Sequence, residues 1–466
     1  MIDNWKGIRV TVMGLGRFGG GLGAVRWLVE QGACVTVSDR DPKEKLANSI
    51  AALRDLDVAL HVGAHHEADF VDTDLVVVNP AVPFNSPFPE IAVHAGVPVT
   101  TELNLFLERN PAPVIGVTGS VGKSTTVAMI ESILVAELGR ARVWVGGNFG
   151  DSLLASLSQI KADHRVILEL SSFQLYRTAA LRWSPEIAVI TNILPNHLDW
   201  HGSFAHYTAA KFNILRFQDP GADQIVIGDH PALRETCRFM FGDLAGIWRY
   251  SVTDRGPGAV MQATSNVDTD NRAIAWPQLR LPIPGRHNLE NAAAALTVAH
   301  AISINQETAL AALASFTGLP HRIKHVRDID GVAFVNDSKA SSPDAAKTAM
   351  QSFEGPLLMI VGGYDKGLDL QDFGKQIAAR AKFAACIGQT GQQLQGHIQN
   401  AHGAAESFQD FASAVRACAA RAVAGDTVLL SPGSASWGMF ADFRERGAQF
   451  EQIVQALAGN RAECRT

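Results

Sequence analysis

Short apolar runs alternate with longer stretches of mixed polar and apolar residues along the whole chain. A run of valine, isoleucine and leucine bounded by glycine, proline or polar residues is typical of a strand buried on both faces of a parallel sheet. Such runs lie at residues 9–13, 34–38, 75–78, 97–99, 114–117, 166–170, 187–191, 332–335, 357–361 and 427–430. Because helix-like stretches separate them, the pattern predicts an α/β protein with largely parallel sheets.

The runs group into three α/β units. Pro111 and Pro113 disfavour helix continuation and predict a linker after the first unit. The second unit ends at Pro320, after an alanine-rich helix predicted over residues 288–302. We therefore predict three domains: a Rossmann-like domain at 1–108, a central domain with a P-loop ATPase-type parallel sheet at 109–318, and a Rossmann-like domain at 319–466.

The first unit carries a glycine-rich turn directly after its first strand. Gly14, Gly16 and Gly19 have the spacing G-x-G-x-x-G, and Asp39 follows at the end of the next strand. An acidic residue about 20 positions beyond such a turn is typical of a Rossmann nucleotide site. Taken alone, this turn predicts a nicotinamide-dependent dehydrogenase.

The second unit begins with a phosphate-binding loop, Thr118-Gly119-Ser120-Val121-Gly122-Lys123-Ser124-Thr125, which lies between a strand and a helix predicted to begin near Thr126. Glycines allow backbone N–H groups to converge on phosphate oxygens, and the lysine can reach the outer phosphates. The hydroxyl of Ser124 can ligate Mg²⁺. The loop is a short form of the Walker pattern, since Val117 stands where the first glycine is expected, and an ordinary βα turn is the alternative.

Composition limits the class of protein. The 466 residues, 47% hydrophobic and 18% charged, fit a multi-domain globular enzyme. A net charge of −6 gives no electrostatic reason to expect nucleic acid or an anionic membrane as a partner. The five cysteines show neither disulfide nor zinc spacing. Because we find no secretory signal and no apolar run near the roughly 20 residues of a membrane span, we expect a cytoplasmic protein.

Polar residues follow several predicted strands, at the edge where open α/β sheets bind ligands. Glu169 could hold Mg²⁺ there, or form a structural ion pair. His197 could ligate a metal or only stabilise its loop. Lys211 lies on a predicted helix, where solvent exposure is the default expectation. Three loops of the third unit are expected to form one wall of a cleft: 336–339, 362–367 and 431–436.

Six motifs, taken in this order, resemble the Mur ligases of peptidoglycan synthesis, and within that family the glutamate-adding members. They are the phosphate loop, ELSSFQL at 169–175, NHLD at 196–199, GRHNLENA at 285–292, GLPHR at 318–322 and NDSKA at 336–340. The resemblance covers essentially the whole chain. It implies an ATP-dependent ligase of the EC 6.3.2 type that acts in cell-wall biogenesis, and so in cell shape, cell division and the cell cycle.

The resemblance also implies a ligand for each domain. The N-terminal domain would bind the UDP-linked substrate through Gly16, Arg17, Phe18 and Asp39, with Asn148 on the substrate side. The central domain would bind ATP, with contacts from Gly119, Gly122, Lys123, Ser124, Thr125, Asn288, Asn291, Arg322 and Asp337. The C-terminal domain would receive glutamate at Lys339, Ser341, Lys366, Ser436 and Phe443.

Two Mg²⁺ ions are implied in the same way. Their ligands would come from Ser124, Glu169, His197 and Lys211, the last as a carbamylated lysine, which replaces the expectation of a solvated side chain. The residues that carry catalysis would be Lys123, Glu169, His197 and Lys211. The two ions, Lys123 and the loop amides would neutralise charge during phosphoryl transfer.

The implied substrates are UDP-N-acetylmuramoyl-L-alanine, glutamate and ATP. A carboxylate is a poor electrophile, so the terminal carboxylate of the UDP-linked substrate would attack the γ-phosphorus of ATP. The resulting acyl phosphate would then lose phosphate when the glutamate amine attacks it. Because water would hydrolyse this intermediate, we expect the C-terminal domain to close over the centre.

Several positions depart from the pattern usual in glutamate-adding members. Val121 replaces a common asparagine, Asn196 an acidic residue and Ser341 a threonine, while Trp437-Gly438-Met439 replaces Leu-Asp-Gln after the matched serine. A bulky indole should reshape a small chiral pocket. We therefore predict a slight preference for L-glutamate over D-glutamate.

Other readings remain open at this point. A D-glutamate-adding enzyme or a sibling Mur ligase that adds another amino acid would share these motifs. A folylpolyglutamate synthase would lack the N-terminal Rossmann unit. A dehydrogenase would leave the phosphate loop unexplained, and a binding module without catalysis would need neither Glu169 nor Lys211.

Overall fold

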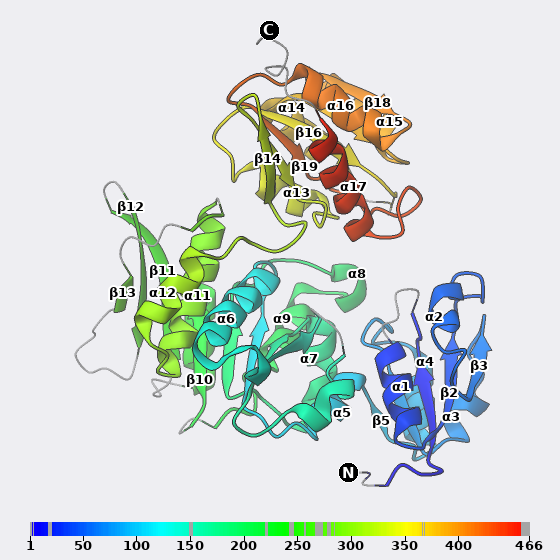
Figure 1. Ribbon diagram of the computed structural model, residues 1–466. Helices are drawn as coiled ribbons and strands as arrows, with labels where there is room; N and C mark the ends of the chain where they lie inside the picture. The colour runs from blue at the N-terminus through cyan, green and yellow to red at the C-terminus, as the bar shows by residue number, and fades with distance from the viewer. Residues whose placement is uncertain are drawn as a thin grey trace. The chain divides into compact units, whose positions relative to one another are not determined.

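The computed structural model describes the chain except residues 1, 3, 17–20, 149–151, 220–221, 242–246, 256–257, 266–273, 277–280, 284, 366, 368 and 458–466. It has the predicted α/β fold, with three separate sheets that are mostly parallel (Figure 1). The chain forms two compact units, Met1–Leu279 with Glu290–Leu313, and Arg280–Leu289 with Ala314–Thr466. The first unit contains the N-terminal and central sheets, and the second contains the C-terminal sheet.

The N-terminal sheet has five parallel strands in the order β3-β2-β1-β4-β5. The strands are β1 Arg9–Met13, β2 Cys34–Asp39, β3 Val58–Val62, β4 Leu75–Val78 and β5 Val99–Thr100. The helices are α1 Leu22–Glu30, α2 Ala47–Ala51, α3 Ala68–Val71, α4 Pro87–His94 and α5 Glu102–Leu107. Alternate residues of β4 bury opposite faces: Val77 packs with α1, and Val78 packs with Phe70 of α3 and Ala92 of α4. Both faces are therefore covered.

The central sheet has the order β13-β12-β11-β10-β9-β6-β8-β7. Its strands are β6 Val114–Thr118, β7 Val143–Gly147, β8 Arg165–Glu169, β9 Ile187–Ile190, β10 Gln224–Gly228, β11 Ile247–Arg255, β12 Gly258–Ser265 and β13 Ile274–Trp276. Strands β6 to β11 are parallel, while β12 and β13 add an antiparallel edge. Because β6 lies between β8 and β9, the carboxyl ends of these three strands meet at one edge.

Helices surround this central sheet. They are α6 Lys123–Leu138, α7 Ser172–Thr178, α8 Leu198–His201, α9 Phe204–Phe212, α10 Pro231–Phe241, α11 Arg286–Ala301 and α12 Gln306–Ala314. Short 3-10 helices lie at Arg140–Arg142, Leu154–Gln159 and Ala179–Leu181. Among the described residues, no helix combines the length and the apolar character that crossing a membrane requires.

The C-terminal sheet has the order β14-β15-β19-β16-β17-β18. Its strands are β14 Lys324–Ile329, β15 Val332–Asn336, β16 Leu357–Gly362, β17 Ala381–Ile387, β18 Ala405–Phe408 and β19 Thr427–Leu430. All neighbours pair in parallel except the hairpin β14–β15. Since β19 lies between β15 and β16, the loops that follow these three strands share one edge of the sheet.

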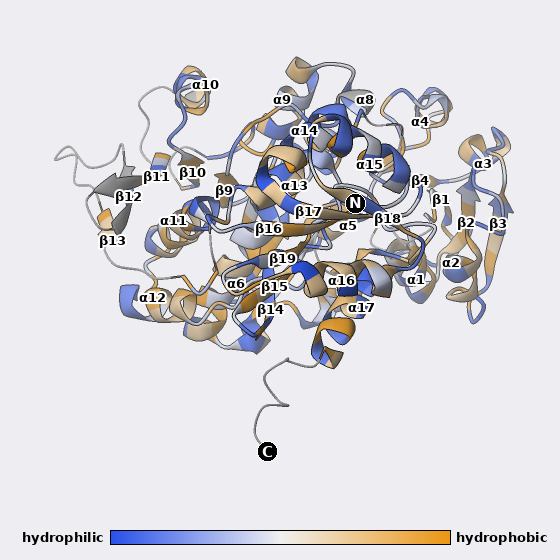
Figure 2. Ribbon diagram, turned by 90° about the horizontal axis from the view of Figure 1, so that it is seen from above, coloured by the Kyte–Doolittle hydropathy of each residue, from blue (hydrophilic) through white to orange (hydrophobic). Residues whose placement is uncertain are grey.

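Five helices cover the C-terminal sheet: α13 Pro343–Met350, α14 Gln371–Arg380, α15 Gly391–Asn400, α16 Phe411–Arg421 and α17 Phe443–Ala456. Residues of β16 again alternate, so Ile360 packs with α16 and α17, and Met359 packs with α13, α14 and α15. Figure 2 shows apolar colour along the strands of this sheet and both colours on the covering helices.

The structure corrects some of the predicted elements. Helix α6 begins at Lys123 rather than near Thr126, because Gly122 takes a left-handed conformation that turns the chain directly into the helix. The strand predicted at 97–99 is reduced to Val99–Thr100, since Pro98 has no N–H to donate to a sheet. Strands β3, β7, β10 to β14, β17 and β18 were not predicted. The predicted domain boundaries stay predictions.

Candidate active site

The phosphate loop packs tightly against its neighbours, and two of its glycines are required by that packing. A Cβ on Gly119, whose φ is +146°, would lie 1.9 Å from Oγ1 of Thr191. A Cβ on Gly122, whose φ is +87°, would lie 2.5 Å from Oδ1 of Asn291 on α11. Neither position leaves room for a larger residue, so the loop backbone is held between the end of β9 and α11.

Lys123 begins α6 and lies over this loop. Its Nζ donates to the carbonyl oxygens of Gly119 at 3.0 Å and Ser120 at 3.1 Å. The loop therefore combines a flexible cation with the positive end of a 16-residue helix. That combination suits the phosphates of a nucleotide. Thr125, in the first turn of the helix, is half-buried.

Glu169 is brought to the loop by the pairing of β6 with β8. Its side chain is buried, and its two oxygens accept separate hydrogen bonds. Oε2 accepts from the hydroxyl of Ser124 at 2.5 Å, and Oε1 accepts from the amide of Asn148 at 2.9 Å. The backbone N–H of Asn148 also donates to the carbonyl oxygen of Glu169 at 2.7 Å. These contacts place a hydroxyl and a carboxylate oxygen side by side at the start of α6.

Lys211 of α9 points into the same region and is only 2% exposed. Its Nζ donates to the carbonyl oxygen of Gly119 at 2.8 Å and lies 4.8 Å from the ring centroid of Tyr207. Burial, together with the nearby charge of Lys123, lowers the pKa of Lys211 to about 6, while the charge of Glu169 opposes the shift. The default expectation of a solvated lysine is therefore wrong, and this amine is largely neutral at pH 7.

His197 lies just before the single turn of α8, with an exposed side chain and φ of +52°. Its ring is 4.9 Å from that of Phe173 on α7. Within the described part of the chain, no three side chains of the His, Cys, Asp and Glu types are grouped so that they could hold a metal ion by themselves. A magnesium site here would draw on hydroxyl, water and phosphate oxygens as well.

The remaining predicted ATP contacts divide between the two compact units. Asn291 lies against the first turn of α6, where its Oδ1 accepts from Oγ1 of Thr126 at 3.3 Å. Asn288 is buried near the start of the same helix. Arg322 and Asp337 belong to the C-terminal unit, where Asp337 accepts from the hydroxyl of Ser431 at 2.8 Å. Burial raises the pKa of Asp337 to about 7. The hydrogen bond from Ser431 and the charge of Arg322 are among the effects that oppose this rise.

The predicted UDP site coincides with a cavity at the carboxyl end of the N-terminal sheet. Gly16 and Asp39 line this cavity of about 570 Å³. The carboxylate of Asp39 accepts from the N–H of Gly16 at 3.1 Å and from that of Asp41 at 2.9 Å. Arg17 and Phe18 lie outside the described residues. His65 also lines the cavity, with Nδ1 2.9 Å from Oγ of Ser38, and was missed because nothing in its local sequence marks it.

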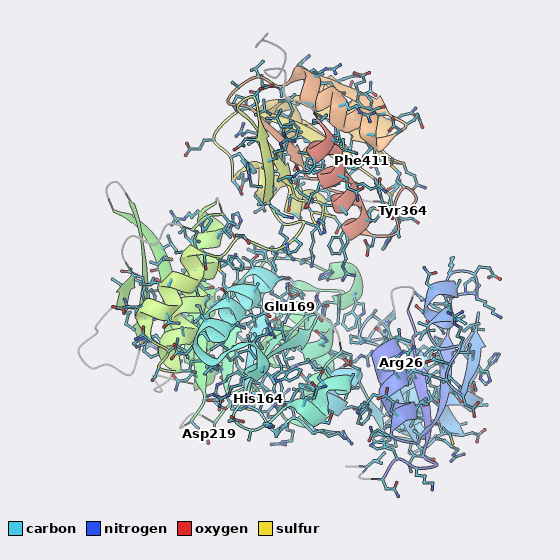
Figure 3. All side chains as sticks on the ribbon, in the orientation of Figure 1. Arg26, His164, Glu169, Asp219, Tyr364 and Phe411 are labelled. Atoms are coloured by element: carbon cyan, nitrogen blue, oxygen red, sulfur yellow. The ribbon has the colours of Figure 1, made fainter. Side chains whose placement is uncertain are left out.

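The predicted glutamate residues gather at the carboxyl edge of the C-terminal sheet. The Nζ of Lys339 lies 5.1 Å from the ring centroid of Phe443. Ser436 is buried in the loop after β19, and Ser341 is half-buried after β15. Lys366 lies outside the described residues. Figure 3 labels Glu169 in the central part and Tyr364 in the loop after β16. The backbone N–H of Tyr364 donates to the carbonyl oxygen of Ala435 at 2.8 Å.

Three family models match the chain in succession. They are described as the Mur ligase MurD-like N-terminal domain at residues 8–101, the Mur ligase middle domain at 117–299, and the Mur ligase glutamate ligase domain at 321–433. Together they match well over half of the chain, and the order is the one that the six motifs predict.

Curated relatives match over nearly the full length. A UDP-N-acetylmuramoylalanine–D-glutamate ligase from Roseiflexus sp. (strain RS-1) is 37% identical, with 97% of this chain and 99% of the relative covered. Ligases of the same name from Pelotomaculum thermopropionicum and Streptococcus pneumoniae (strain Hungary19A-6) are 34% and 35% identical, each with 98% of this chain and 99% of the relative covered.

Solved structures share the fold at lower identity. UDP-N-acetylmuramate-alanine ligase from Thermotoga maritima is 20% identical with a TM-score of 0.58 and covers 96% of this chain and 99% of its own. The MurF ligase of Thermotoga maritima in complex with ADP is 17% identical with a TM-score of 0.58, and covers 98% and 99%. FolC of E. coli in complex with DHPP and ADP covers only 76% of this chain and 93% of its own, at 23% identity and a TM-score of 0.55.

These relatives contradict the predicted preference for L-glutamate, because they are named for D-glutamate. The structure offers a physical reason for the error. The indole of Trp437 packs edge-on against the ring of Tyr364, with centroids 5.4 Å apart. A bulky residue at this position thus serves packing between two loops, and its size alone does not determine which enantiomer a neighbouring pocket accepts.

Proposed function

The chain belongs to the Mur ligase family and is an ATP-dependent ligase that forms C–N bonds in peptidoglycan synthesis, and from this premise we propose that it adds D-glutamate to UDP-N-acetylmuramoyl-L-alanine. Relatives that share 34% to 37% of its residues carry this activity in their names. The observation that supports an ATP-driven mechanism most strongly is the joining of Ser124, Glu169 and Lys211 around one phosphate loop.

Magnesium fits the residues that the structure brings together. The hydroxyl of Ser124 and a carboxylate oxygen of Glu169 are hard oxygen donors 2.5 Å apart, at the place where nucleotide phosphates would lie. We propose that they hold one Mg²⁺ and that His197 and a carbamate on Lys211 support a second. When bound, the ions would neutralise phosphate charge during transfer. Lys123 would swing from the carbonyls of Gly119 and Ser120 to the phosphates of ATP.

The environment of Lys211 suits carbamylation. Carbon dioxide reacts only with a neutral amine, and a pKa lowered to about 6 keeps the Nζ of Lys211 neutral at pH 7. The reaction forms a bond between Nζ and carbon and releases one proton. Lys123, whose charge lowers this pKa, would then face an anionic carbamate instead of a second amine.

The chain's own residues then account for the order of events. Asp39 and the cavity beside it would hold the UDP moiety. The terminal carboxylate would attack the γ-phosphorus of ATP beside Lys123 and form an acyl phosphate, with ADP as the leaving group. D-Glutamate would approach from the C-terminal unit, between Lys339, Ser341, Ser436 and Phe443, together with Lys366. Attack of its amine on the acyl carbon would expel phosphate and leave an amide.

Three further points belong to this proposal. Asn288, Arg322 and Asp337 would contact the nucleotide with Asn291, while Asn148 would orient the UDP-linked substrate. The domains would divide at residues 108/109 and 318/319. The enzyme would work in the cytoplasm without a membrane partner, and closure of the C-terminal domain would shield the acyl phosphate from water.

A turnover assay tests the proposal. Purified protein with Mg²⁺, ATP and UDP-N-acetylmuramoyl-L-alanine receives either D- or L-glutamate, and phosphate and the UDP-linked product are both measured. We expect product with D-glutamate at a rate far above that with L-glutamate, and no product when the UDP-linked substrate is omitted. Product with L-glutamate alone, or with neither enantiomer, would contradict the proposal.

A further inference from the structure

Arg446 of α17 is completely buried, with 0% exposure, although arginine is rarely found inside proteins without a partner. All three nitrogens of its guanidinium donate hydrogen bonds. Nε donates to the hydroxyl of Ser338 at 3.0 Å, and Nη2 donates to the carbonyl oxygen of the same residue at 2.7 Å. Nη1 donates to the carbonyl oxygen of Ser434 at 3.1 Å. The planar fork thus joins two backbone segments.

These segments are two of the loops that follow neighbouring strands. Ser338 lies after β15, directly before Lys339, and Ser434 lies after β19, two residues before Ser436. The hydroxyl of Ser338 accepts from Arg446 and itself donates to the carbonyl oxygen of Phe443 at 2.7 Å. Arg446 is therefore linked to segments that carry three of the predicted glutamate contacts, Lys339, Ser436 and Phe443.

The loop after β16 lies close to the same guanidinium. Gly363 has φ of +156°, and a Cβ placed on it would lie 3.3 Å from Nη1 of Arg446 and 2.2 Å from the carbonyl oxygen of Ala435. Arg446 thus donates hydrogen bonds to the loops after β15 and β19 and lies close to the loop after β16. It is also linked to the start of its own helix through Ser338.

Burial of this cation has a cost that its contacts must offset. Burial lowers the pKa of Arg446 to about 9, while the charge of Asp337 opposes the shift. The three hydrogen bonds of its guanidinium go to a hydroxyl and two carbonyl oxygens, which are directional but uncharged acceptors. An arrangement of this kind fixes geometry better than it adds stability.

We propose that Arg446 is a positioning residue for the amino-acid substrate: its guanidinium fixes the loops that carry Lys339 and Ser436 at the separation that D-glutamate requires. The inference rests on the proposed function. Arg446 itself need not touch the substrate. Lysine cannot replace it, because an ammonium group is a point charge that cannot bridge Ser338 and Ser434 in fixed directions.

The test is the variant Arg446→Lys, which keeps the charge and removes the fork. We expect the KM for D-glutamate to rise about tenfold or more, as the loss of a charged hydrogen bond of about 1.5–3 kcal/mol implies. The KM for UDP-N-acetylmuramoyl-L-alanine should stay within about twofold, since the cavity proposed to hold it is lined by residues of the N-terminal sheet and its loops. A purely structural role would instead lower the melting temperature and leave the KM for D-glutamate unchanged.

Arg380→Lys is the matched control. Arg380 ends α14 and its guanidinium also joins two carbonyl oxygens of one backbone segment, those of Phe353 and Gly355. That segment precedes β16, at the opposite end of the sheet from the predicted glutamate residues. We expect this variant to lose stability without a change in the KM for D-glutamate. An equal rise in both variants would overturn the inference.

Ser338→Ala provides a second, milder change should Arg446→Lys fail to fold. It removes the hydroxyl that links Nε of Arg446 to Phe443, and we expect the KM for D-glutamate to rise about threefold or more, equivalent to one neutral hydrogen bond. In the double variant the effects should be less than additive, because both act on one contact. An unchanged KM in Ser338→Ala would overturn the inference, whether or not Arg446→Lys folds.

The same experiment distinguishes a failure of the proposed function from a failure of the positioning role of Arg446. If the wild-type protein forms no amide with D-glutamate, the proposed function fails. If the wild-type protein is active and the KM for D-glutamate is normal in Arg446→Lys and Ser338→Ala, only the positioning role fails.

Discussion

At the scale of single residues, the proposed phosphate site depends on side chains that each hold one polar or charged group in a fixed position. The ammonium group of Lys123 donates to the loop carbonyls of Gly119 and Ser120 and is thereby held over the loop. We expect Lys123→Ala to lower kcat by about 10³-fold, the loss typical when one charge-stabilising donor is removed. Phosphate release under saturating substrates measures this. Lys161→Ala, a change at an exposed position of the same unit, should have wild-type kcat.

Near-normal turnover of Lys123→Ala would contradict the phosphate role assigned to this lysine. A loss of activity in both variants would point instead to a general sensitivity of the central sheet to lysine replacement.

Lys211 makes a prediction about stability and pH. In the unfolded chain its amine has the ordinary pKa of 10.5, whereas burial lowers the pKa in the folded protein to about 6. Between these values the unfolded chain binds one more proton at this site, so stability rises with pH. The slope is at most about 1.4 kcal/mol per pH unit. Lys211→Met removes the titrating group and should flatten this rise.

The measurement is chemical unfolding of both proteins at pH 7 and pH 9 in buffers freed of carbon dioxide, which prevents carbamylation. The free energy of unfolding of the wild-type protein should increase relative to that of Lys211→Met between the two pH values. Parallel changes in the two proteins would show that Lys211 does not titrate with a lowered pKa.

At the scale of secondary structure elements, the two ends of α6 allow a matched comparison. Gly122 and Gly139 flank this helix and both have positive φ, but a Cβ on Gly122 would meet Asn291 at 2.5 Å, whereas nothing lies within 4 Å of one on Gly139. Alanine at either position costs about 1–3 kcal/mol, because both glycines have a backbone conformation with positive φ that other residues rarely adopt. We expect Gly122→Ala to weaken ADP binding about tenfold in addition, because the loop must move away from Asn291.

Calorimetric titration with ADP and thermal unfolding of both variants separate the two effects. Gly139→Ala should lose stability and keep its affinity for ADP. Equal affinities in the two variants would contradict the view that contact with α11 shapes the loop.

A comparison of the predicted strands with the observed ones shows which strands can be found from the sequence of one chain. Strands β6, β8 and β16 are confirmed because each buries a run rich in valine, isoleucine and leucine. Strand β3 was missed because it lies at a sheet edge with mostly exposed residues. Strand β17, AKFAACI, was missed because the middle of its buried run is Ala-Ala-Cys and not a run of valine, isoleucine and leucine.

The same limit applies to the candidate site. Motif residues such as Ser124 and Glu169 lie together because neighbouring strands end at one edge, a rule that holds before any coordinates are known. Arg446 and His201 were not predicted. His201 is buried with Nε2 2.9 Å from Oγ of Ser172, and so fastens α8 to α7. Their roles arise from contacts between distant parts of the chain, which local sequence does not encode.

At the scale of the whole molecule, the proposed function assigns the UDP-linked substrate to the edge of the N-terminal sheet. A change at Asp39 on this edge should therefore alter the kinetics of that substrate. Asp39→Asn weakens the carboxylate that holds the N–H groups of Gly16 and Asp41, and we expect the KM for UDP-N-acetylmuramoyl-L-alanine to rise about tenfold while that for ATP is unchanged. Asp55→Asn, a change at an exposed position of the same domain, is the control.

A rise in the KM for ATP as large as that for the UDP-linked substrate would contradict this division of labour. So would wild-type kinetics in Asp39→Asn, because the cavity beside this residue would then have another ligand.

The central claim is that the phosphate loop serves to activate a carboxylate, and isotope transfer tests it most directly. UDP-N-acetylmuramoyl-L-alanine labelled with ¹⁸O in its terminal carboxylate is turned over with ATP, Mg²⁺ and D-glutamate, and the phosphate is analysed by mass spectrometry. An acyl phosphate loses its phosphate together with one carboxylate oxygen, so we predict one ¹⁸O in each phosphate released. Phosphate free of label, formed in step with amide product, would contradict the account.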